Sequence, residues 1–239
     1  MSPTTFSHSV HNAAAAYIAA ALGLRGPTLT VTQFAFPFHE ALRLGGAWLA
    51  EGRCDAVLVG AADEMGGVLA RIAARELRAA ADGKIRPFAF APSPATVPGE
   101  GAAFLLLSAA PSGAGFGRIE DVTVGAGPRE RPRPDAQLLD ADGMAEDETG
   151  YAAAVRPDAP AAGYAPLWGG MPAGSAFSCA AAAVMLRAQR LFATPVADEA
   201  PGVAVCRETA PARIERVVCA KRDCQSRTGM ITLARRLPG

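Results

Sequence analysis

Residues 26–35 read GPTLTVTQFA, and residues 36–52 continue as FPFHEALRLGGAWLAEG. The β-branched run from Thr28 to Thr32 predicts a short strand. Pro37 fits the first turn of a helix, and Gly52 is a typical C-terminal stop for it. The stretch therefore predicts a strand, a tight loop and a helix, with Ala35 in the loop where the helix starts.

The pattern of strand followed by helix repeats directly downstream. Residues 55–62, DAVLVGAA, form a continuous apolar run, which is typical of a strand buried on both faces. A helix over residues 67–80 follows. This alternation indicates the α/β class, and the right-handed crossover rule makes the strands at 28–32 and 55–62 parallel neighbours.

The rest of the chain carries shorter patterns. We expect a linker at 111–117 and an exposed loop rich in Arg and Pro at 128–134. Asn12 is a typical cap, and Gly23 a typical stop, for a helix over residues 13–22. Further helices are expected at 146–155 and 172–192, and strands at 102–107, 118–124, 164–168, 203–207, 214–220 and 230–235.

Composition and charge exclude several classes of protein. The chain has 239 residues, of which 50% are apolar, enough for a substantial core. Lys+Arg and Asp+Glu both number 23, so the net charge gives no reason to expect nucleic acid as a partner. No apolar stretch reaches the length of a membrane span, and no basic leader precedes an apolar region. We therefore expect a cytoplasmic protein without a membrane partner.

The cysteines and histidines form no metal-binding motif. The five cysteines are odd in number and include no C-x-x-C pair, so we expect buried free thiols. A zinc site at Cys219 and Cys224 would need further ligands, and no histidine lies near them in the sequence. His8, His11 and His39 are expected to have capping, packing or surface roles. The sequence therefore predicts no metal and no cofactor.

Several motifs resemble those of one enzyme family. Residues 26–35 resemble the nucleophile elbow of β-ketoacyl-acyl-carrier-protein synthases, which reads GPxxTVDTAC. In that family the Cys sits at the start of a helix whose positive end lowers the thiol pKa. Alignment from either side of the motif places Ala35 at the Cys position. Residues 86–88 and 99–107 resemble the family's RPF…GEGAG…L segment, whereas its terminal GFGGTN loop corresponds to CQSRTG at 224–229.

The resemblance implies a thiolase-like fold of the α/β class, with αβαβα layers. It covers the chain from the nucleophile region to the C-terminus. Residues 2–3 and 6–12 resemble a mid-chain segment of a synthase, so the fold is expected to be incomplete in its first half. The resemblance divides the chain into residues 1–111, a remnant of the N-terminal half that carries the elbow, and residues 118–239, the C-terminal half.

Condensing enzymes of this family use one Cys and two His, and the resemblance implies that this chain has none of the three. The first His lies in a motif like EAHGTGT, and the comparable stretch LLDADGMA places Asp142 there. An ionised Asp142 would repel a developing oxyanion. The second His lies in a motif like KSNIGHxxAAAG, where APLWGGMPA places Gly170 at the His and Ala165 at the Lys.

A fold that keeps these backbone motifs and loses these side chains resembles the chain-length-factor subunits of type II polyketide synthases. Those subunits pair with an active synthase and shape the shared acyl tunnel. The resemblance implies a non-catalytic subunit in polyketide or fatty-acid-like biosynthesis. Its partner would be an active β-ketoacyl synthase subunit in a heterodimer or a second copy in a homodimer, and an acyl carrier protein is a further possible partner.

Two other functions stay open. Chain-length factors often carry Gln in place of the Cys, which helps some relatives to act as malonyl decarboxylases. A shift of the loop by two residues would bring Gln33 to that position. A residual malonyl-carrier-protein decarboxylase or acyltransferase is therefore one alternative. The other is a degenerate synthase fragment, because the first half is short.

The residues around position 35 have two interpretations. Phe34, Phe36 and Phe38 bracket Ala35 at alternate positions. They are either plain core packing, or they plug this subunit's own acyl pocket or form the floor of the partner's tunnel.

Two surfaces are candidates for contact with partners. In the synthases the strand before the nucleophile pairs with its counterpart across the dimer axis, which implies an interface strand of Thr28, Leu29, Thr30, Val31 and Thr32. Three arginines recur at helical spacing and share a face: Arg71, Arg75 and Arg78. They are either an ordinary solvated face or a docking site for an acidic carrier protein.

Overall fold

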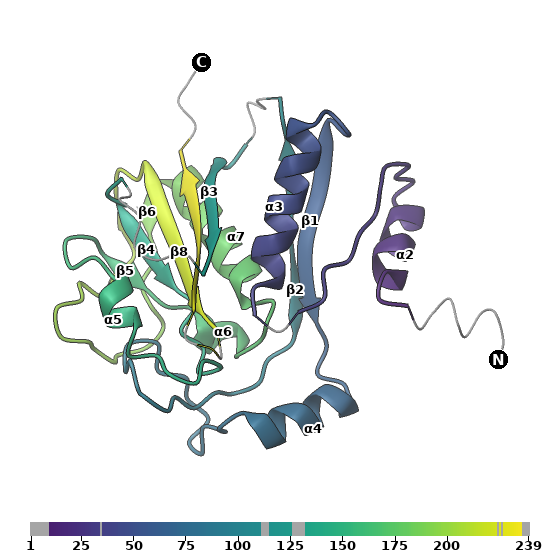
Figure 1. Cartoon of the computed structure of the whole chain (residues 1–239). Coiled ribbons are helices and arrows are strands. Elements are labelled where there is room, and N and C mark those ends of the chain that lie inside the picture. The colour runs from purple at the N-terminus through teal and green to yellow at the C-terminus, as the bar shows by residue number, and fades with distance from the viewer. Residues whose placement is uncertain are drawn as a thin grey trace.

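The computed structural model describes residues 10–33, 35–110, 115–125, 132–223, 225 and 227–235. The described residues form three sheets, of which the five-stranded sheet and the sheet of β1 and β2 lie on either side of a layer formed by the two longest helices (Figure 1), whereas β6 and β7 form a short third sheet. The helices are α2 (Ala13–Ala21), α3 (Pro37–Ala50), α4 (Gly67–Glu76), α5 (Tyr151–Ala154), α6 (Ala165–Trp168) and α7 (Gly174–Ala188). The strands are β1 (Ala56–Asp63), β2 (Gly101–Ser108), β3 (Arg118–Val124), β4 (Ala136–Leu139), β5 (Ala161–Ala162), β6 (Arg190–Leu191), β7 (Ala210–Pro211), β8 (Arg216–Arg222) and β9 (Thr228–Ala234).

The larger sheet is mixed, with the strand order β3-β9-β8-β4-β5. β9 runs antiparallel to β3 and β8, whereas β4 runs parallel to β8 and β5. All four residues of β4 are buried, as expected for a strand with neighbours on both edges and cover on both faces. The parallel register sets Leu139 beside Ala220. The residues that follow these two positions therefore emerge at the same end of the sheet.

β1 and β2 form a separate antiparallel sheet of two strands, from Ala56 beside Ser108 to Asp63 beside Gly101. The sequence predicted that residues 55–62 form a strand buried on both faces and parallel to a strand at 28–32. Both expectations are wrong. Alternate residues of β2 are exposed along its whole length, and residues 28–32 form no strand and are largely exposed. The apolar run in β1 has one packed face and one open face.

α3 and α7 lie between the two sheets, as Figure 1 shows, and both were predicted from the sequence. α3 packs so closely on β1 that a Cβ atom at Gly45 would lie 2.8 Å from Cγ2 of Val59. α7 packs against β8 and β2. Its buried face carries small side chains such as Ala176, Cys179 and Ala182, which allow both sheets to approach the helix.

α2 covers the range predicted for it but stands outside the core. It ends before Gly23, whose φ of 66° suits glycine. The expected cap is wrong, because the side chain of Asn12 makes no capping bond. Its amide group instead donates to Thr28 Oγ1 at 3.2 Å and accepts from Thr30 Oγ1 at 3.0 Å. Ala19 is the one buried residue of α2, and the helix lies to the side of β1 (Figure 1).

Other expected elements also differ from the structure. The strand expected at 164–168 is wrong, because residues from Ala165 onward form α6 with Pro166 in its first turn. Residues 203–207 contribute a single bridge, between Val205 and Ala161, rather than a strand. The helix expected at 146–155 is limited to α5, and α4 ends at Glu76 rather than at residue 80. β4 was not predicted.

No helix in the described part of the chain is long and apolar enough to cross a membrane. Cys179, Cys206 and Cys219 are buried free thiols, as predicted, and Cys54 is a half-buried one. Cys224, residues 111–114 of the expected linker and residues 126–131 around the expected Arg- and Pro-rich loop lie outside the described residues.

Candidate functional site

A cavity of about 780 Å³ lies between α4 and the loops that follow β4, α6 and β8. Ala35 and Gly170, which the sequence placed at the nucleophile and at the second imidazole, both line it. Asp142 is buried directly beneath, next to the lining residue Gly143. The fold therefore brings together all three positions that the motifs had identified.

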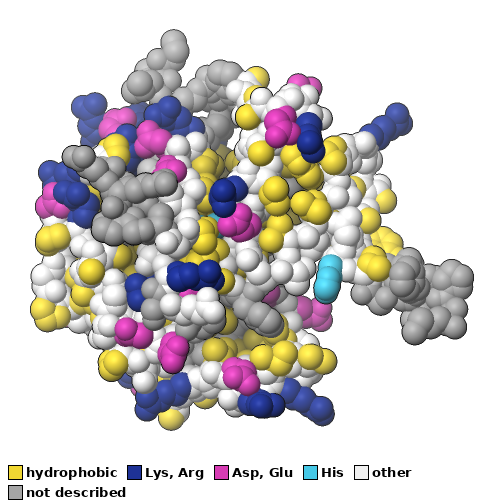
Figure 2. All heavy atoms as spheres, in the orientation of Figure 1, with side chains coloured by type: hydrophobic (Ala, Val, Ile, Leu, Met, Phe, Trp, Pro, Cys, Tyr) yellow, Lys and Arg dark blue, Asp and Glu magenta, His cyan; other side chains and the backbone are white. Residues whose placement is uncertain are grey.

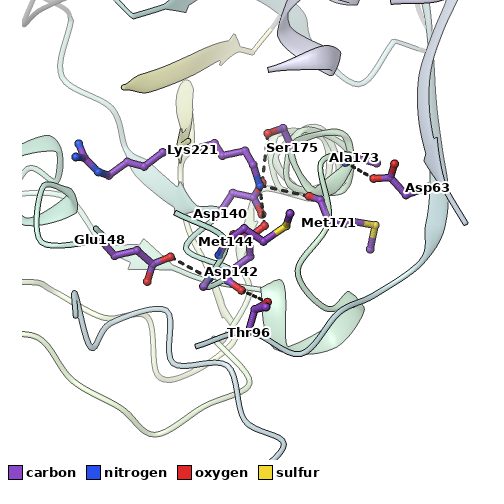
Figure 3. Close-up of polar contacts among 12 residues, drawn as sticks. Asp63, Thr96, Asp140, Asp142, Met144, Glu148, Met171, Ala173, Ser175 and Lys221 are labelled. Atoms are coloured by element: carbon purple, nitrogen blue, oxygen red, sulfur yellow. Dashed lines mark hydrogen bonds and ion pairs between the residues drawn. The ribbon is translucent and has the colours of Figure 1, made fainter. Parts of the chain in front are cut away.

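Lys221 is the centre of this site, and no sequence motif indicated its role. It lies on β8 and is buried, and its Nζ donates to Asp142 Oδ2 at 2.7 Å and to Asp140 Oδ2 at 2.9 Å (Figure 3). A third bond, of 3.4 Å, reaches the carbonyl oxygen of Met171. All three protons of the ammonium group are therefore engaged. Asp142 is not a lone carboxylate but one half of a buried ion pair.

The parallel register of β4 and β8 explains this cluster. Asp140 and Asp142 follow the end of β4, and Lys221 follows Ala220, which pairs with the last residue of β4. Burial opposes the charged form of Lys221, but the attraction of the two carboxylates outweighs it and raises the pKa of the ammonium group. Burial also raises the pKa of Asp140, and the Lys221 charge only partly opposes this effect.

Asp140 also contacts the start of α7. Ser175 Oγ donates to Asp140 Oδ2 at 3.2 Å. A Cβ atom at Gly174 would lie 2.9 Å from both carboxylate oxygens, so glycine is needed for the helix to start here. A carboxylate at a helix N-terminus is favoured by the helix dipole. The ion cluster therefore joins β4, β8 and α7.

Glu148 is a second buried carboxyl group in the same loop. Its Oε1 accepts a hydrogen bond of 3.0 Å from the Gly143 amide (Figure 3). Burial, and then repulsion by Asp142, raise its pKa to about 8. Glu148 is therefore mainly protonated at neutral pH. Beside it, Tyr151 Oη donates to the carbonyl oxygen of Asp140 at 2.9 Å and accepts from the Arg222 amide at 2.8 Å.

Position 170, which the motif aligns with the second imidazole, has no room for a side chain. Thr96 Oγ1 donates to the carbonyl oxygen of Asp142, and the two atoms are 2.6 Å apart. A Cβ atom at Gly170 would lie 2.1 Å from Thr96 Oγ1 and 2.9 Å from that same carbonyl oxygen. Gly170 is also fixed by its amide, which donates to Val97. No side chain fits at position 170 unless Thr96 moves.

The residues around Ala35 do not form the wall of this cavity. Phe36 and Phe38 are fully buried, and neither lines it. Phe34 lies outside the described residues. Gln33, the weak candidate for a residual activity, is exposed and is not part of the lining.

His39 lies one helical turn beyond Ala35 and is buried. Its ring meets Phe36 edge-on, with the ring centroids 5.2 Å apart, and its Nε2 faces Gly229. Burial, and then the charge of Lys221, lower its pKa to about 3. A weak backbone contact with Gly229 opposes this shift without cancelling it. His39 is therefore a neutral packing residue, consistent with the role expected for it.

The three arginines do not share one helical face. Arg71 and Arg75 are exposed on α4, and Arg75 pairs with Glu76 at 3.2 Å. Arg78 lies beyond the end of the helix, where its Nη1 donates to the carbonyl oxygen of Ser93 at 3.1 Å and its side chain lines the cavity. The expected alignment is wrong because α4 stops at Glu76.

Comparison with known proteins agrees with this architecture. Residues 1–111 match the family described as "Beta-ketoacyl synthase, N-terminal domain". The structure is similar to that of the ishigamide ketosynthase/chain length factor, with a TM-score of 0.80 and 16% identity, over 99% of this chain and 68% of that chain. The chain has a ketosynthase-like fold.

Two other solved structures support the same conclusion. The ketosynthase-like chain matches the type II polyketide synthase complex AntDE:AntF, an acyl carrier protein bound to its ketosynthase, with a TM-score of 0.78 and 12% identity over 98% of this chain and 69% of that chain. It matches a β-ketoacyl synthase from Burkholderia phymatum with a TM-score of 0.76 and 15% identity, over 99% of this chain and 68% of that chain. Curated protein sequences give no significant match.

Loss of the Lys221 charge is expected to destabilise the fold severely. Lys221→Met leaves two buried carboxylates facing each other without a cation, at an expected cost of about 3–5 kcal/mol in the free energy of unfolding. Urea unfolding followed by circular dichroism measures this cost. Arg213→Met is the matched control, because Arg213 is 86% exposed and pairs with Glu215 at the surface, and it should change stability by less than about 1 kcal/mol. Equal effects of the two substitutions would contradict the structural role of the cluster.

Glu148 is expected to make stability fall as the pH rises. Its pKa is 4.5 ordinarily and about 8 in the folded chain, so between these values the folded state binds more protons than the unfolded state. The free energy of unfolding should therefore decrease across this window, and Glu148→Gln should flatten the decrease. Urea titrations between about pH 5 and pH 8 test this, with Glu146→Gln, a change at an exposed carboxyl group, as the control. Parallel pH profiles for the wild type and Glu148→Gln would contradict it.

Proposed function

We propose that this chain is a non-catalytic, ketosynthase-like subunit of the chain-length-factor type, which pairs with an active synthase in polyketide or fatty-acid-like biosynthesis. The main support for the proposal is the arrangement of residues at the cavity. Ala35 stands where the related enzymes have their nucleophile, and Thr96 closes the space beside Gly170. The ammonium group of Lys221 has all its donors bound to protein oxygens.

The polar groups near the cavity stabilise one another rather than a reacting substrate. An oxyanion needs donors that are free and aimed at it. Here Lys221 and Thr96 donate to protein acceptors, and Asp142 adds a negative charge next to the ammonium group. The alternative of a decarboxylase based on Gln33 gains no support, since Gln33 is exposed and outside the cavity lining.

The segment before Ala35 supports the pairing part of the proposal. Residues 28–32 are extended and largely exposed, and the described residues provide no strand partner for them. Thr28 and Thr30 are oriented by the side chain of Asn12. An exposed β-branched segment that pairs with no strand of the described residues is a typical site for strand addition. An active synthase subunit would supply the paired strand, and an acyl carrier protein would meet the pair.

Restoring the nucleophile alone is expected not to restore condensation. Ala35→Cys adds a thiol at the cavity wall, but neither imidazole position holds a donor. Wild type and variant should both form no β-ketoacyl product from an acyl donor and malonyl-carrier-protein. Greater alkylation of the variant than of the wild type would show that the new thiol is accessible. Acyl-enzyme on the wild type by intact mass, or condensation by either chain without a partner, would contradict the proposal.

The exposed segment is expected to be needed for assembly. Thr30→Pro removes a backbone donor and should weaken the complex with a co-expressed active synthase by at least about 10-fold in Kd, with little change in unfolding. Thr30→Ala, which loses the hydroxyl and keeps the backbone donor, should retain most of the affinity. Co-purification and light scattering measure the complex. A stable monomer that recovers no synthase, or an uncooperative thermal unfolding curve, would favour a degenerate fragment.

A further inference from the structure

The two-stranded sheet is covered on one face only. Its inner residues pack beneath α3 and α7, with Val59 buried. On the outer face, Leu58 is 37% exposed, Phe104 47% and Leu106 73%. Hydrophobic side chains are also visible at the surface in the region of α3 and β1 in Figure 2. An apolar sheet face that is partly exposed to solvent in this way is a typical contact site for another polypeptide.

The sheet also has an open edge at β1. β1 pairs with β2 along all eight residues without a register shift, and the described chain offers no partner on its other side. Its sequence, AVLVGAAD, contains no Lys, Pro or bulge, which are the usual devices against strand addition. A sheet of two strands is marginal by itself. The matched ketosynthase/chain length factor has about a third of its length without a counterpart here, since 68% of it is covered.

The charges at this edge disfavour a second copy of the chain as its occupant. Asp55 and Glu64 are exposed at the two ends of β1. In an antiparallel pair of two copies, with Ala56 facing Asp63, Asp55 of one copy would face Glu64 of the other at both ends. Like charges directly opposite one another destabilise strand pairing. A strand with a basic residue at each end would instead place opposite charges there.

We infer that β1 is a docking edge for a polypeptide of different sequence, which adds an apolar β-strand flanked by Lys or Arg and covers the outer face at Leu58, Phe104 and Leu106. Backbone hydrogen bonds to the β1 edge would supply affinity, and the flanking cations would supply specificity. This edge is separate from residues 28–32. Failure of the proposed synthase pairing would therefore leave the inference intact, and the reverse also holds.

Two synthetic peptides test the inference on the whole chain. Both have eight residues with Val and Thr alternating in the centre. One has Lys at each end, and its control has Glu at each end. The Lys peptide should bind saturably in fluorescence anisotropy, at least about 10-fold tighter than the Glu peptide. It should also slow amide hydrogen exchange at alternate residues of 56–63.

A matched pair of variants locates the binding site. Leu106→Ser should weaken binding of the Lys peptide severalfold, because it removes apolar cover from the outer face. Val68→Ser, on α4, removes a residue that is 76% exposed and should leave binding unchanged. Equal binding of both peptides, no change in exchange at 56–63, or equal effects of the two variants would overturn the inference.

Other occupants of the edge would give distinct results. A dimer in ultracentrifugation, with slow exchange at 56–63 that is lost in Leu106→Ser, would identify a second copy and overturn the inference. Slow exchange in the isolated monomer at those amides of 56–63 that face away from β2 would mean that the chain covers its own edge, and would also overturn it.

Discussion

The buried ammonium group of Lys221 is the interaction on which the centre of this fold depends. Removing a charge from water is costly, and the cost is offset here by two carboxylates and a carbonyl oxygen at 2.7–3.4 Å. The ammonium group comes from β8, the two carboxylates from the end of β4, and the carbonyl oxygen from the loop before α7. Their meeting fixes the parallel register of the two strands and the starting point of the helix.

The same cluster decides what the cavity can do. Burial and the charge of Asp142 raise the pKa of Glu148 to about 8, whereas burial and the charge of Lys221 lower that of His39 to about 3, so both groups are mainly neutral at pH 7. A negative charge that developed at Ala35 would therefore lie near a carboxylate and near donors that are already hydrogen-bonded to protein oxygens. The arrangement stabilises the resting fold, which is the reverse of a preorganised oxyanion site.

Much of the fold was predictable from local sequence, but the centre of the site was not. Helix signals such as Pro37 and Gly23 gave α3 and α2 nearly to the residue. The apolar run of β1 correctly predicted a strand. It did not predict that one face of the strand is exposed, because the residues on both faces are apolar. The motif at 138–145 led to Asp142, whereas Lys221 lies 79 residues away with no local signal. Thr96 acts through a hydrogen bond to a backbone carbonyl oxygen, and such a bond leaves no motif of side-chain types in the sequence.

One hydrogen bond connects the open sheet to the site. Asp63, the last residue of β1, lines the cavity, and its Oδ2 accepts a bond of 2.6 Å from the amide of Ala173 (Figure 3). Ala173 precedes the first residue of α7, whose Gly174 touches Asp140. A polypeptide bound at the β1 edge would therefore contact the same strand that holds Asp63 against the loop before α7, in which the Met171 carbonyl oxygen accepts from Lys221. The small sheet and the cavity are therefore connected directly, through the hydrogen bond between Asp63 and Ala173.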